Sequence, residues 1–495
     1  MNILLIYPQF PETFWSFTYA LPFIGKKAAF PPLGLITVAA LLPEQWNKHL
    51  VDCNIESLTD EDLAWADMVF IGGMAIQRRS AQQIITRCHA ADKKIVAGGP
   101  LFTIEPDAFN EVDHLVLDEA ELTLPLFLAD LHSGQPKKVY RAAQFCDLGD
   151  TPVPLWNLVK MEKYASMNLQ FSRGCPFNCE FCNVTTLFGH RPRIKTSQQV
   201  IRELDRLYAS GWRSSIFFVD DNFIGNRQYL KNHLLPALIE WRQNKKGCVF
   251  FTEASINLAD DPELLAMMVK AGFDAVFIGI ESPDEDSLTE CHKTQNKNRD
   301  LLESVKKIQR TGLQVMGGFI VGFDSDLPSI FQRQIDFIQH SGIAIAMVGL
   351  LQAPPGTRLF DRLQRESRVD ATFSGDNVDG TTNIIPQMGI EQLSRGYQTI
   401  MESIYSPRNY YRRVRTLLQE LKTPATIQPM SVQRFFSIFR AAIRLGILGQ
   451  ERFQYWQLML WTLIRRPKLM PLAITLSIYG YHYRKICERY ILGSR

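Results

Sequence analysis

The sequence predicts an α/β protein with a parallel-sheet domain at residues 1–135, a linker at 136–165, a partial (β/α)6 barrel at 166–385 and a mainly helical C-terminal region at 386–495. Two series of short apolar runs, each alternating with helical patterns, predict the two parallel sheets. A change in composition predicts the third region. From about residue 386 the strand-like runs stop, and aromatic and basic residues become frequent.

Five apolar runs in the first region are short and continuous, so helices should cover both faces of their sheet. The runs span residues 3–7, 50–53, 68–71, 94–97 and 114–117. Glycine pairs follow the third and fourth runs, at Gly72-Gly73 and Gly98-Gly99. Ligands of open α/β sheets bind beyond the carboxyl ends of the strands, where glycine lets the backbone approach them closely. Tight turns alone would also account for either pair.

Six further runs predict the barrel. They span residues 168–171, 215–219, 249–251, 275–280, 315–321 and 345–351. Helical patterns such as 198–208 and 301–309 lie between them, so the region reads as successive βα units. In such a barrel the chemistry lies on the loops that follow the strands.

Composition bounds the class of protein. At 495 residues, with 46% hydrophobic and 21% charged residues, the chain should fold into several packed domains. Its first residues run directly into a strand-like segment with no basic region before it, so we expect no secretory signal and a cytoplasmic location. The nine cysteines include one dense cluster, which favours a metal site over a disulfide framework.

That cluster is Cys175, Cys179 and Cys182, with the spacing C-x3-C-x2-C directly after the first barrel strand. Three thiolates at this spacing are typical of an iron–sulfur cluster or of zinc. A four-iron cluster with only three cysteines keeps one iron open, as catalysis requires. The alternatives are a structural zinc site and an electron-transfer cluster that recruits Cys248 or Cys291 as a fourth ligand.

Residues 172–182, Ser-Arg-Gly-Cys-Pro-x-x-Cys in their first part, resemble the signature of radical S-adenosylmethionine (SAM) enzymes, in the form used by the cobalamin-binding branch. The resemblance implies a 4Fe-4S cluster held by the three cysteines. It also implies that SAM binds the open iron and is cleaved to a radical that abstracts hydrogen from the substrate.

The same resemblance implies SAM contacts at the ends of the next strands. The expected residues are Asp220, Asp221, Asn222, Glu253, Ser255 and Glu281. A carboxylate pair at a barrel mouth suits the cationic ammonium group of SAM. Capping of the following segment is the alternative role for the two aspartates. No residue is assigned as a catalytic acid or base.

The first domain resembles the Rossmann-like cobalamin-binding domain of this branch at residues 30–35, 98–103 and 118–121. The resemblance implies cobalamin contacts at Gly73, Met74, Gly98, Gly99, Thr103 and Glu119. The sequence lacks the Asp-x-His-x-x-Gly loop that places a histidine below cobalt. We therefore expect residues 74–78 to face cobalt without a histidine ligand. A degenerate domain without cobalamin is the alternative.

Over nearly its full length the chain resembles hopanoid C-2 methylases. The matching segments are residues 14–17, 30–34, 172–182, 218–222, 295–300, 317–323 and 353–357. The resemblance implies methylation of ring A of a hopanoid lipid and a flavodoxin- or ferredoxin-type reductant. A cobalamin-dependent radical SAM enzyme acting on a tetrapyrrole or another isoprenoid is the alternative, and a cobalamin or redox sensor is the non-enzymatic one. No nucleic-acid partner is expected.

The C-terminal charge is distinctive. Residues 401–495 contain 16 Lys/Arg against 4 Asp/Glu, whereas the whole chain has a net charge of only +3. Basic and aromatic residues are mixed there at helical spacing, with no apolar stretch long enough to span a bilayer. Two interpretations follow: helices lying peripherally on the inner face of the membrane, or helices packed on the acidic remainder of the protein.

Overall fold

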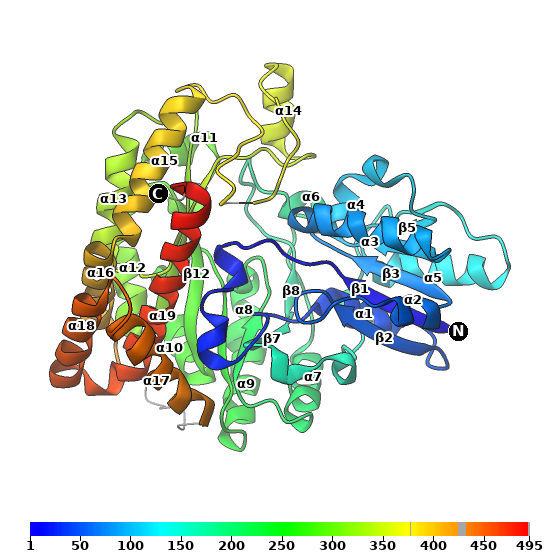
Figure 1. Ribbon diagram of the computed structural model, residues 1–495, viewed down its shortest axis with the longest axis horizontal. Helices are drawn as coiled ribbons and strands as arrows, with labels where there is room; N and C mark the ends of the chain where they lie inside the picture. Colours follow the sequence, from blue (N-terminus) through cyan, green and yellow to red (C-terminus); the bar gives the residue numbers. More distant parts are fainter. Residues whose placement is uncertain (377, 424–431, 494–495) are drawn as a thin grey trace.

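The computed structural model describes residues 1–376, 378–423 and 432–493. Two six-stranded parallel sheets form two bodies that lie side by side, with the C-terminal helices on the far side of the second (Figure 1). The predicted fold class and the order of the three regions are confirmed.

The first sheet has the strand order β2-β1-β3-β4-β5-β6. Its strands are β1 (Asn2–Tyr7), β2 (Asn47–Asp52), β3 (Met68–Gly72), β4 (Lys94–Gly98), β5 (His114–Val116) and β6 (Val139–Tyr140). The last of these pairs with β5 and lies in the segment predicted as a linker. The linker therefore contributes a short edge strand to the first sheet.

Alternation along the strands buries both faces of this sheet. Ile3 and Leu5 face α1 (Leu33–Leu41) and α5 (Ala120–His132). Leu4 and Ile6 face the opposite way, in a separate core. The helices of that second face are α2 (Asp60–Trp65), α3 (Arg78–Ala90) and α4 (Pro100–Ile104). Successive side chains of a strand point to opposite faces, so continuous apolar runs require helices on both.

The second sheet is the partial barrel, in the order β14-β13-β12-β11-β10-β7. Its strands are β7 (Ser166–Leu169), β10 (Ser215–Phe218), β11 (Val249–Glu253), β12 (Phe273–Glu281), β13 (Gln314–Val321) and β14 (Ala346–Leu350). All five pairings are parallel. Their carboxyl ends therefore meet at one edge, as the βα pattern predicts.

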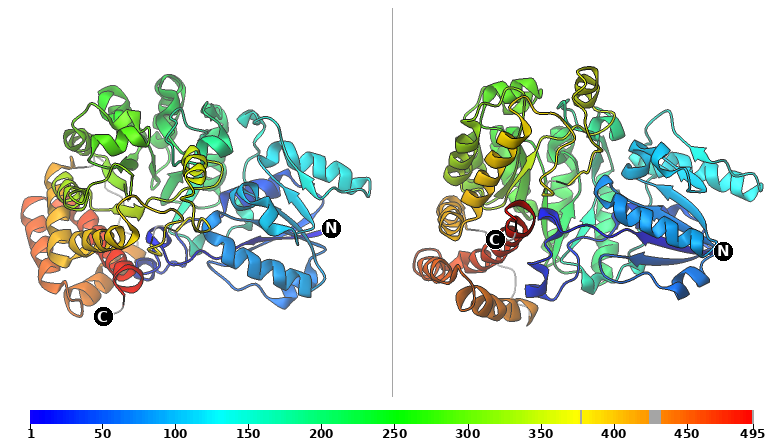
Figure 2. Two further views of the ribbon diagram at one scale, coloured as in Figure 1. Left: turned by 90° about the horizontal axis from the view of Figure 1, so that it is seen from above. Right: turned by 45° about the horizontal axis from the view of Figure 1, so that its top comes forward.

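Helices cover the outside of the barrel (Figure 2). They are α7 (Ser197–Ala209), α8 (Arg227–Tyr229), α9 (Leu235–Gln243), α10 (Pro262–Ala271), α12 (Leu301–Thr311) and α13 (Ile330–Ser341). Three short helices, α6 (Val184–Phe188), α11 (Glu285–Glu290) and α14 (Arg358–Arg365), lie in the upper part of the molecule in Figure 1. A small antiparallel hairpin, β8 (Ser172–Arg173) with β9 (Arg193–Ile194), carries the cysteine loop.

In its described residues the C-terminal region consists mainly of α15 (Ile390–Tyr405), α16 (Pro407–Glu420), α17 (Val432–Gly446), α18 (Arg452–Arg465) and α19 (Met470–Ile486). α15 and α16 pack on α13, and α19 lies against the segment that follows β1. That segment, residues 8–32, is here called the N-terminal strap. Figure 1 shows it in dark blue, crossing from the first sheet to the barrel and α19.

Candidate functional site

The cysteine loop begins at a glycine that no other residue could replace without strain. Gly174 has φ +92°, and a Cβ there would lie 2.9 Å from the carbonyl oxygens of Phe188 and Gly189. Cys175 follows directly, with its N–H donated to Gly189 O at 3.3 Å. This close backbone packing turns the chain out of β8 and holds the loop at the barrel mouth.

The three predicted ligands are free thiols. Cys179 is buried, and Cys175 and Cys182 are half-buried. Burial raises the pKa of Cys182 to about 12, and the neighbouring charge of Lys293 counteracts this shift. In the described part of the chain, no three metal-binding side chains converge on a single-ion site. A 4Fe-4S cube is larger and takes one cysteine on each of three irons, so three separate thiols beside a cation fit it.

Lys293 is a site residue that the sequence analysis missed. Its Nζ donates to Glu281 Oε1 at 2.6 Å, and both side chains are almost fully buried. Burial disfavours the ammonium, yet Glu281 and the thiols of Cys179 and Cys182 hold the pKa of Lys293 above its ordinary value. A fixed cation therefore lies where thiolates bound to a cluster would carry negative charge.

The segment after Lys293 packs on both the cysteine loop and the fourth barrel strand. Gln295 Nε2 lies 3.8 Å from Cys179 Sγ. Asn296 donates to the carbonyl oxygens of Gly279 and Ile280 at 3.1 and 2.9 Å. The conspicuous polar run at residues 295–300 was the signal in the sequence that could have placed this segment at the site.

Asp220 braces the cysteine loop and does not face the barrel mouth. Its carboxylate accepts the main-chain N–H groups of Phe171 and Ser172, and Ser172 Oγ donates to it at 2.6 Å. It is fully buried, which raises its pKa to about 7. The predicted capping role is not seen either, because the bonds go back to the preceding strand.

Two other predicted carboxylates remain open to a ligand. Glu253 ends β11, and its carboxylate makes no hydrogen bond or ion pair within residues 1–376, 378–423 and 432–493. Burial, with Asp221 and Asp220 as neighbouring charges, raises its pKa to about 8. Burial also raises the pKa of Asp221 to about 6, and this carboxylate accepts only a long bond of 3.4 Å from Gly174 N. Two desolvated acids facing one site would both be stabilised by a cation.

Asn222 and Ser255 form a pair between neighbouring strand ends. Asn222 Nδ2 donates to Ser255 Oγ at 3.3 Å, and Ser255 N donates to Asn222 Oδ1 at 3.3 Å. Both residues are buried. Of the six predicted SAM residues, the structure therefore brings Asp221, Glu253 and this pair to one mouth. Asp220 lies behind the loop, and Glu281 is bound to Lys293.

Aromatic rings line the barrel interior below these carboxylates. Phe217 and Phe251 are stacked, with ring centroids 4.7 Å apart. Trp15 of the N-terminal strap lies 5.2 Å from Phe277, and Phe30 lies 5.4 Å from Phe217. Phe251 and Phe277 are only half-buried although they face inward. The interior therefore offers an apolar, partly accessible wall one strand step below the predicted SAM residues.

The carboxyl edge of the first sheet presents backbone rather than side chains. Gly99 has φ +89°, and a Cβ there would lie 3.3 Å from Gly73 O. A Cβ on Gly98 would meet Val116 O at 2.5 Å. Thr103 Oγ1 accepts the N–H of Asp118 at 3.0 Å. These predicted cobalamin residues therefore lie on adjacent loops, and Met74 beside them is half exposed.

Glu119 has a different place from the one expected. Its carboxylate binds Arg173 at 3.0 Å and Arg193 at 2.8 Å, and Glu121 binds Arg173 at 2.7 Å. The side chains of both glutamates are nearly inaccessible. Because both guanidinium groups engage the Glu119 carboxylate, only its main chain is available to cobalamin. The ion pairs join the first domain to the hairpin that carries the cysteines.

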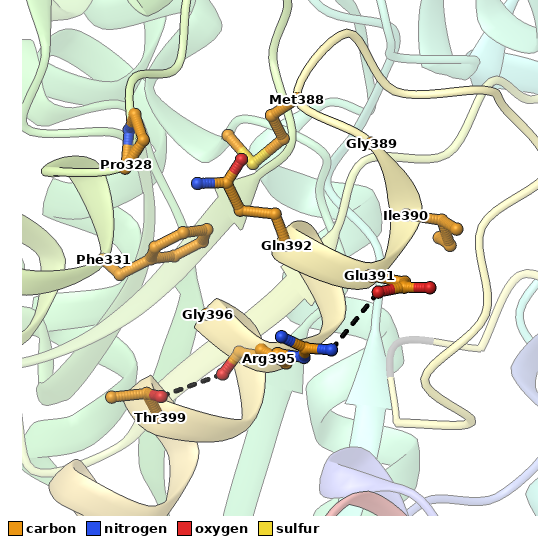
Figure 3. Close-up of a pocket in the computed structure, with 10 residues that line it drawn as sticks. All are labelled: Pro328, Phe331, Met388, Gly389, Ile390, Glu391, Gln392, Arg395, Gly396 and Thr399. Carbon is orange, nitrogen blue, oxygen red and sulfur yellow. Dashed lines mark hydrogen bonds and ion pairs between the residues drawn. The ribbon is translucent and has the colours of Figure 1, made fainter.

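A surface depression of about 630 Å³ lies elsewhere, between the start of α13 and the first half of α15 (Figure 3). Phe331, Met388 and Gln392 line it, and Glu391 pairs with Arg395 at 3.2 Å in full contact with solvent. None of the predicted site residues lines it. It lies on the outer helices, so the chemistry belongs to the barrel mouth.

Comparison with known proteins agrees with this geometry. Residues 169–337 match the radical SAM superfamily, and residues 357–493 match a domain of unknown function, DUF4070. The chain is similar to an uncharacterized methyltransferase of Synechocystis sp., with 40% identity over 99% of this chain and 93% of that protein. It is also similar to the hopanoid C-2 methylase of Rhodopseudomonas palustris, with 36% identity over 94% of this chain and 90% of that protein.

A solved structure has the same architecture. The cobalamin-dependent SAM radical enzyme OxsB superposes with a TM-score of 0.63 at 14% identity, covering 95% of this chain and 80% of that one. This likeness concerns the fold. A radical SAM domain works with a 4Fe-4S cluster and SAM, so both cofactors belong to this chain. The chain is a radical SAM methyltransferase and belongs to the family of the hopanoid C-2 methylase.

Proposed function

We propose that the protein is a cobalamin-dependent radical SAM C-methyltransferase that methylates C-2 in ring A of a hopanoid lipid. The observation that carries this proposal is the similarity to the hopanoid C-2 methylase over nearly the whole of both chains. When bound, the cluster reduces SAM to generate the radical that activates the substrate carbon, and cobalamin carries the methyl group.

The chain's own residues would divide the work at the barrel mouth. Cys175, Cys179 and Cys182 hold the cluster, and Lys293 offsets its charge. Asp221 and Glu253 bind the ammonium of SAM, because both carboxylates face the mouth with few partners of their own. The partly accessible rings below them suit an apolar ring system.

Cobalamin would lie on the glycine loops of the first domain without a histidine below cobalt. The nearby histidines are badly placed for that role: His114 begins β5, and His89 lies at the end of α3, both toward the amino edge of the sheet. His49 lies within β2 and contacts Asp62 at 3.3 Å. Protein loaded with cobalamin should show a base-off spectrum that His49→Ala, His89→Ala and His114→Ala leave unchanged.

The test is conversion of an unmethylated hopanoid by purified protein under anaerobic conditions, with SAM, cobalamin and a flavodoxin- or ferredoxin-type reductant. The expected product is heavier by one methylene group, with the added methyl on ring A. A tetrapyrrole offered in parallel tests the main alternative. SAM cleavage with methylation of the tetrapyrrole alone would refute the hopanoid assignment. Lipid analysis of a deletion strain and its complement extends the test to the cell.

We also propose that the protein works as a peripheral protein at the inner face of the membrane, through residues 401–495. In the described residues no helix is both long and apolar enough to cross a bilayer. A lipid substrate and the excess of cationic residues in this region support the proposal.

A further inference from the structure

The hairpin of α17 and α18 carries a large exposed apolar surface, here called the hairpin face. Its side chains are between 37% and 75% exposed. They are Phe435, Phe436, Phe439, Ile443, Ile447, Leu448, Phe453, Trp456, Leu460, Leu463 and Ile464. Single exposed apolar residues are ordinary, but a contiguous set of this size marks an interaction surface.

Helical spacing places these residues on one side of each helix. Phe435, Phe439 and Ile443 recur every four residues along α17, and Phe453, Trp456 and Leu460 are spaced by three and four residues along α18. The opposite sides are buried, for example at Leu445 and Leu458. Each helix of the hairpin therefore has one apolar side packed against the protein and a second apolar side exposed to solvent.

The tip of the hairpin is its most exposed part. Ile447 and Leu448 connect the helices and are 60% and 75% exposed. Trp456 Nε1 donates to Gly446 O at 2.9 Å, which fixes the connection. A rigid, apolar tip would enter a lipid phase first without having to order a loop.

The charges around the hairpin face are cationic. Arg440, Arg452, Arg465 and Lys468 are exposed. The sole acidic residue between positions 432 and 470 is Glu451, which is buried and paired with Arg484 at 2.8 Å. Basic residues beside an apolar face complement a lipid surface with anionic headgroups.

The rest of the C-terminal region is packed on the barrel. Tyr397, Ile400 and Ile404 of α15 and Leu417 of α16 are buried. In α19, Tyr483 is fully buried against Phe14 of the strap. Tyr455 of α18 is also buried. The packed interpretation of residues 401–495 therefore holds for α15, α16 and α19, whereas the α17–α18 hairpin keeps an exposed apolar face.

The hairpin face adjoins the segment that enters the barrel. Arg440 of α17 donates to the carbonyl oxygens of Pro22 and Phe23 in the strap, at 3.2 and 3.1 Å. The same strap places Trp15 against Phe217 and Phe277 inside the barrel. One continuous segment thus connects the exposed surface to the aromatic interior.

We infer that the α17–α18 hairpin docks on the surface of an anionic bilayer, with the hairpin face among the acyl chains and its arginines at the headgroups. The strap beside α17 then leads a membrane lipid toward the barrel. This inference rests on the proposed lipid substrate for its purpose, but docking itself requires neither cofactor nor substrate. A second copy of the chain is the competing occupant, and charge disfavours it because two such faces would repel.

The test is co-sedimentation with vesicles of phosphatidylcholine alone and of phosphatidylcholine with phosphatidylglycerol. The parent should partition onto the anionic vesicles at low salt and less at high salt, since salt screens attraction at the surface. Leu448→Ser with Phe453→Ser should lower that partition by about tenfold or more. Arg452→Gln with Arg465→Gln should remove most of the dependence on anionic lipid.

Leu126→Ser with Leu327→Ser is the matched control, because both leucines are exposed on other parts of the molecule. This control should bind vesicles as the parent does, and circular dichroism checks that all three variants fold. Equal partition of the Leu448/Phe453 variant and the parent would overturn the inference. So would a parent that forms dimers by light scattering and fails to bind vesicles. Neither result bears on methylation of a detergent-solubilised hopanoid, which tests the proposed function separately.

Discussion

The carboxyl edges of the two parallel sheets are both expected to bind a cofactor, but they offer it different chemistry. The barrel edge carries desolvated charges: three thiols, Lys293, and the open carboxylates of Asp221 and Glu253. The edge of the first sheet offers glycine backbone around Gly73 and Gly99. A charged ligand such as SAM needs fixed charges, whereas close approach of a large flat ligand needs the absence of side chains. Substitutions should therefore act through charge at one edge and through shape at the other.

The largest effect should follow loss of a cysteine at the charged edge. Cys175→Ala, Cys179→Ala or Cys182→Ala removes one of the three proposed thiolate ligands of the cluster. We expect each variant to lose the iron–sulfur absorbance and 5′-deoxyadenosine formation completely. The control is Cys248→Ala. The Cys248 thiol is buried against the carbonyl oxygen of Trp212, so this variant should keep both the absorbance and 5′-deoxyadenosine formation. Activity in any of the first three variants would mean that another ligand set holds the cluster.

Breaking the contact between the two edges should have the next largest effect. Arg173→Met leaves Glu119 with one partner and Glu121 without its guanidinium, both buried. Removing one member of a buried ion pair costs about 3–5 kcal/mol of unfolding free energy. Chemical denaturation should show this loss. Arg395→Met, which removes an exposed pair with Glu391, should cost at most ~0.5 kcal/mol. Similar losses in both variants would contradict a structural role for the interdomain pairs.

At the charged edge, Glu253→Gln should weaken SAM binding by about ten- to a hundredfold, the loss of one charge-assisted contact. The pKa of Glu253 is raised to about 8, so near neutral pH much of the ligand-free protein carries the protonated acid. Only the carboxylate attracts the SAM ammonium, so this contribution to affinity should increase as pH rises through about 8 and level off roughly one unit above it. Equilibrium dialysis of anaerobic, cluster-loaded protein measures this. The exposed Glu263→Gln should match the parent, and an unchanged pH profile in Glu253→Gln would exclude this role.

The smallest effect on stability should come from shape at the first sheet. Gly99→Ala places a Cβ beside Gly73 O at a left-handed φ, which should cost ~1 kcal/mol. Gly134→Ala is a matched control, because its φ is +75° and nothing lies within 4 Å of the added Cβ. Both variants should lose similar stability, but only Gly99→Ala should bind cobalamin more weakly in an absorbance titration. Equal cobalamin affinity in the two would remove these glycine loops from the binding site.

Sequence reasoning performed best where a residue's role depends on its order along the chain. The strand series and the cysteine spacing are patterns among residues close together in the sequence, so they predicted both sheets and the position of the loop. The direction of a side chain depends on distant partners. The sequence placed Asp220 and Asp221 together, yet the structure turns Asp220 to Ser172 and leaves Asp221 at the mouth. The position of the Glu119 carboxylate likewise depends on distant partners, because Arg173 and Arg193 both pair with it.

Lys293 escaped prediction because its role depends on partners that are not its neighbours in the sequence. Glu281 is 12 residues away, and the cysteine loop is still more distant in sequence. The C-terminal helices show the same limit: composition revealed cations and aromatics but not which helices pack inward. Exposure at Leu448 and burial at Tyr455 follow from tertiary packing alone.

The N-terminal strap also imposes an order of assembly. His482 of α19 contacts Phe14 O at 3.1 Å, and Arg489 pairs with Glu12 at 3.2 Å, so partners more than 460 residues apart close the barrel wall. Contacts between residues so far apart in the sequence form late, because closing the long loop between them costs entropy before the contacts can stabilise the fold. During synthesis the two sheets can fold while α19 is still within the ribosome. Phe14 of the strap gains its partner Tyr483 only once α19 has been made, so we expect the strap, with Trp15, to settle on the barrel late in folding.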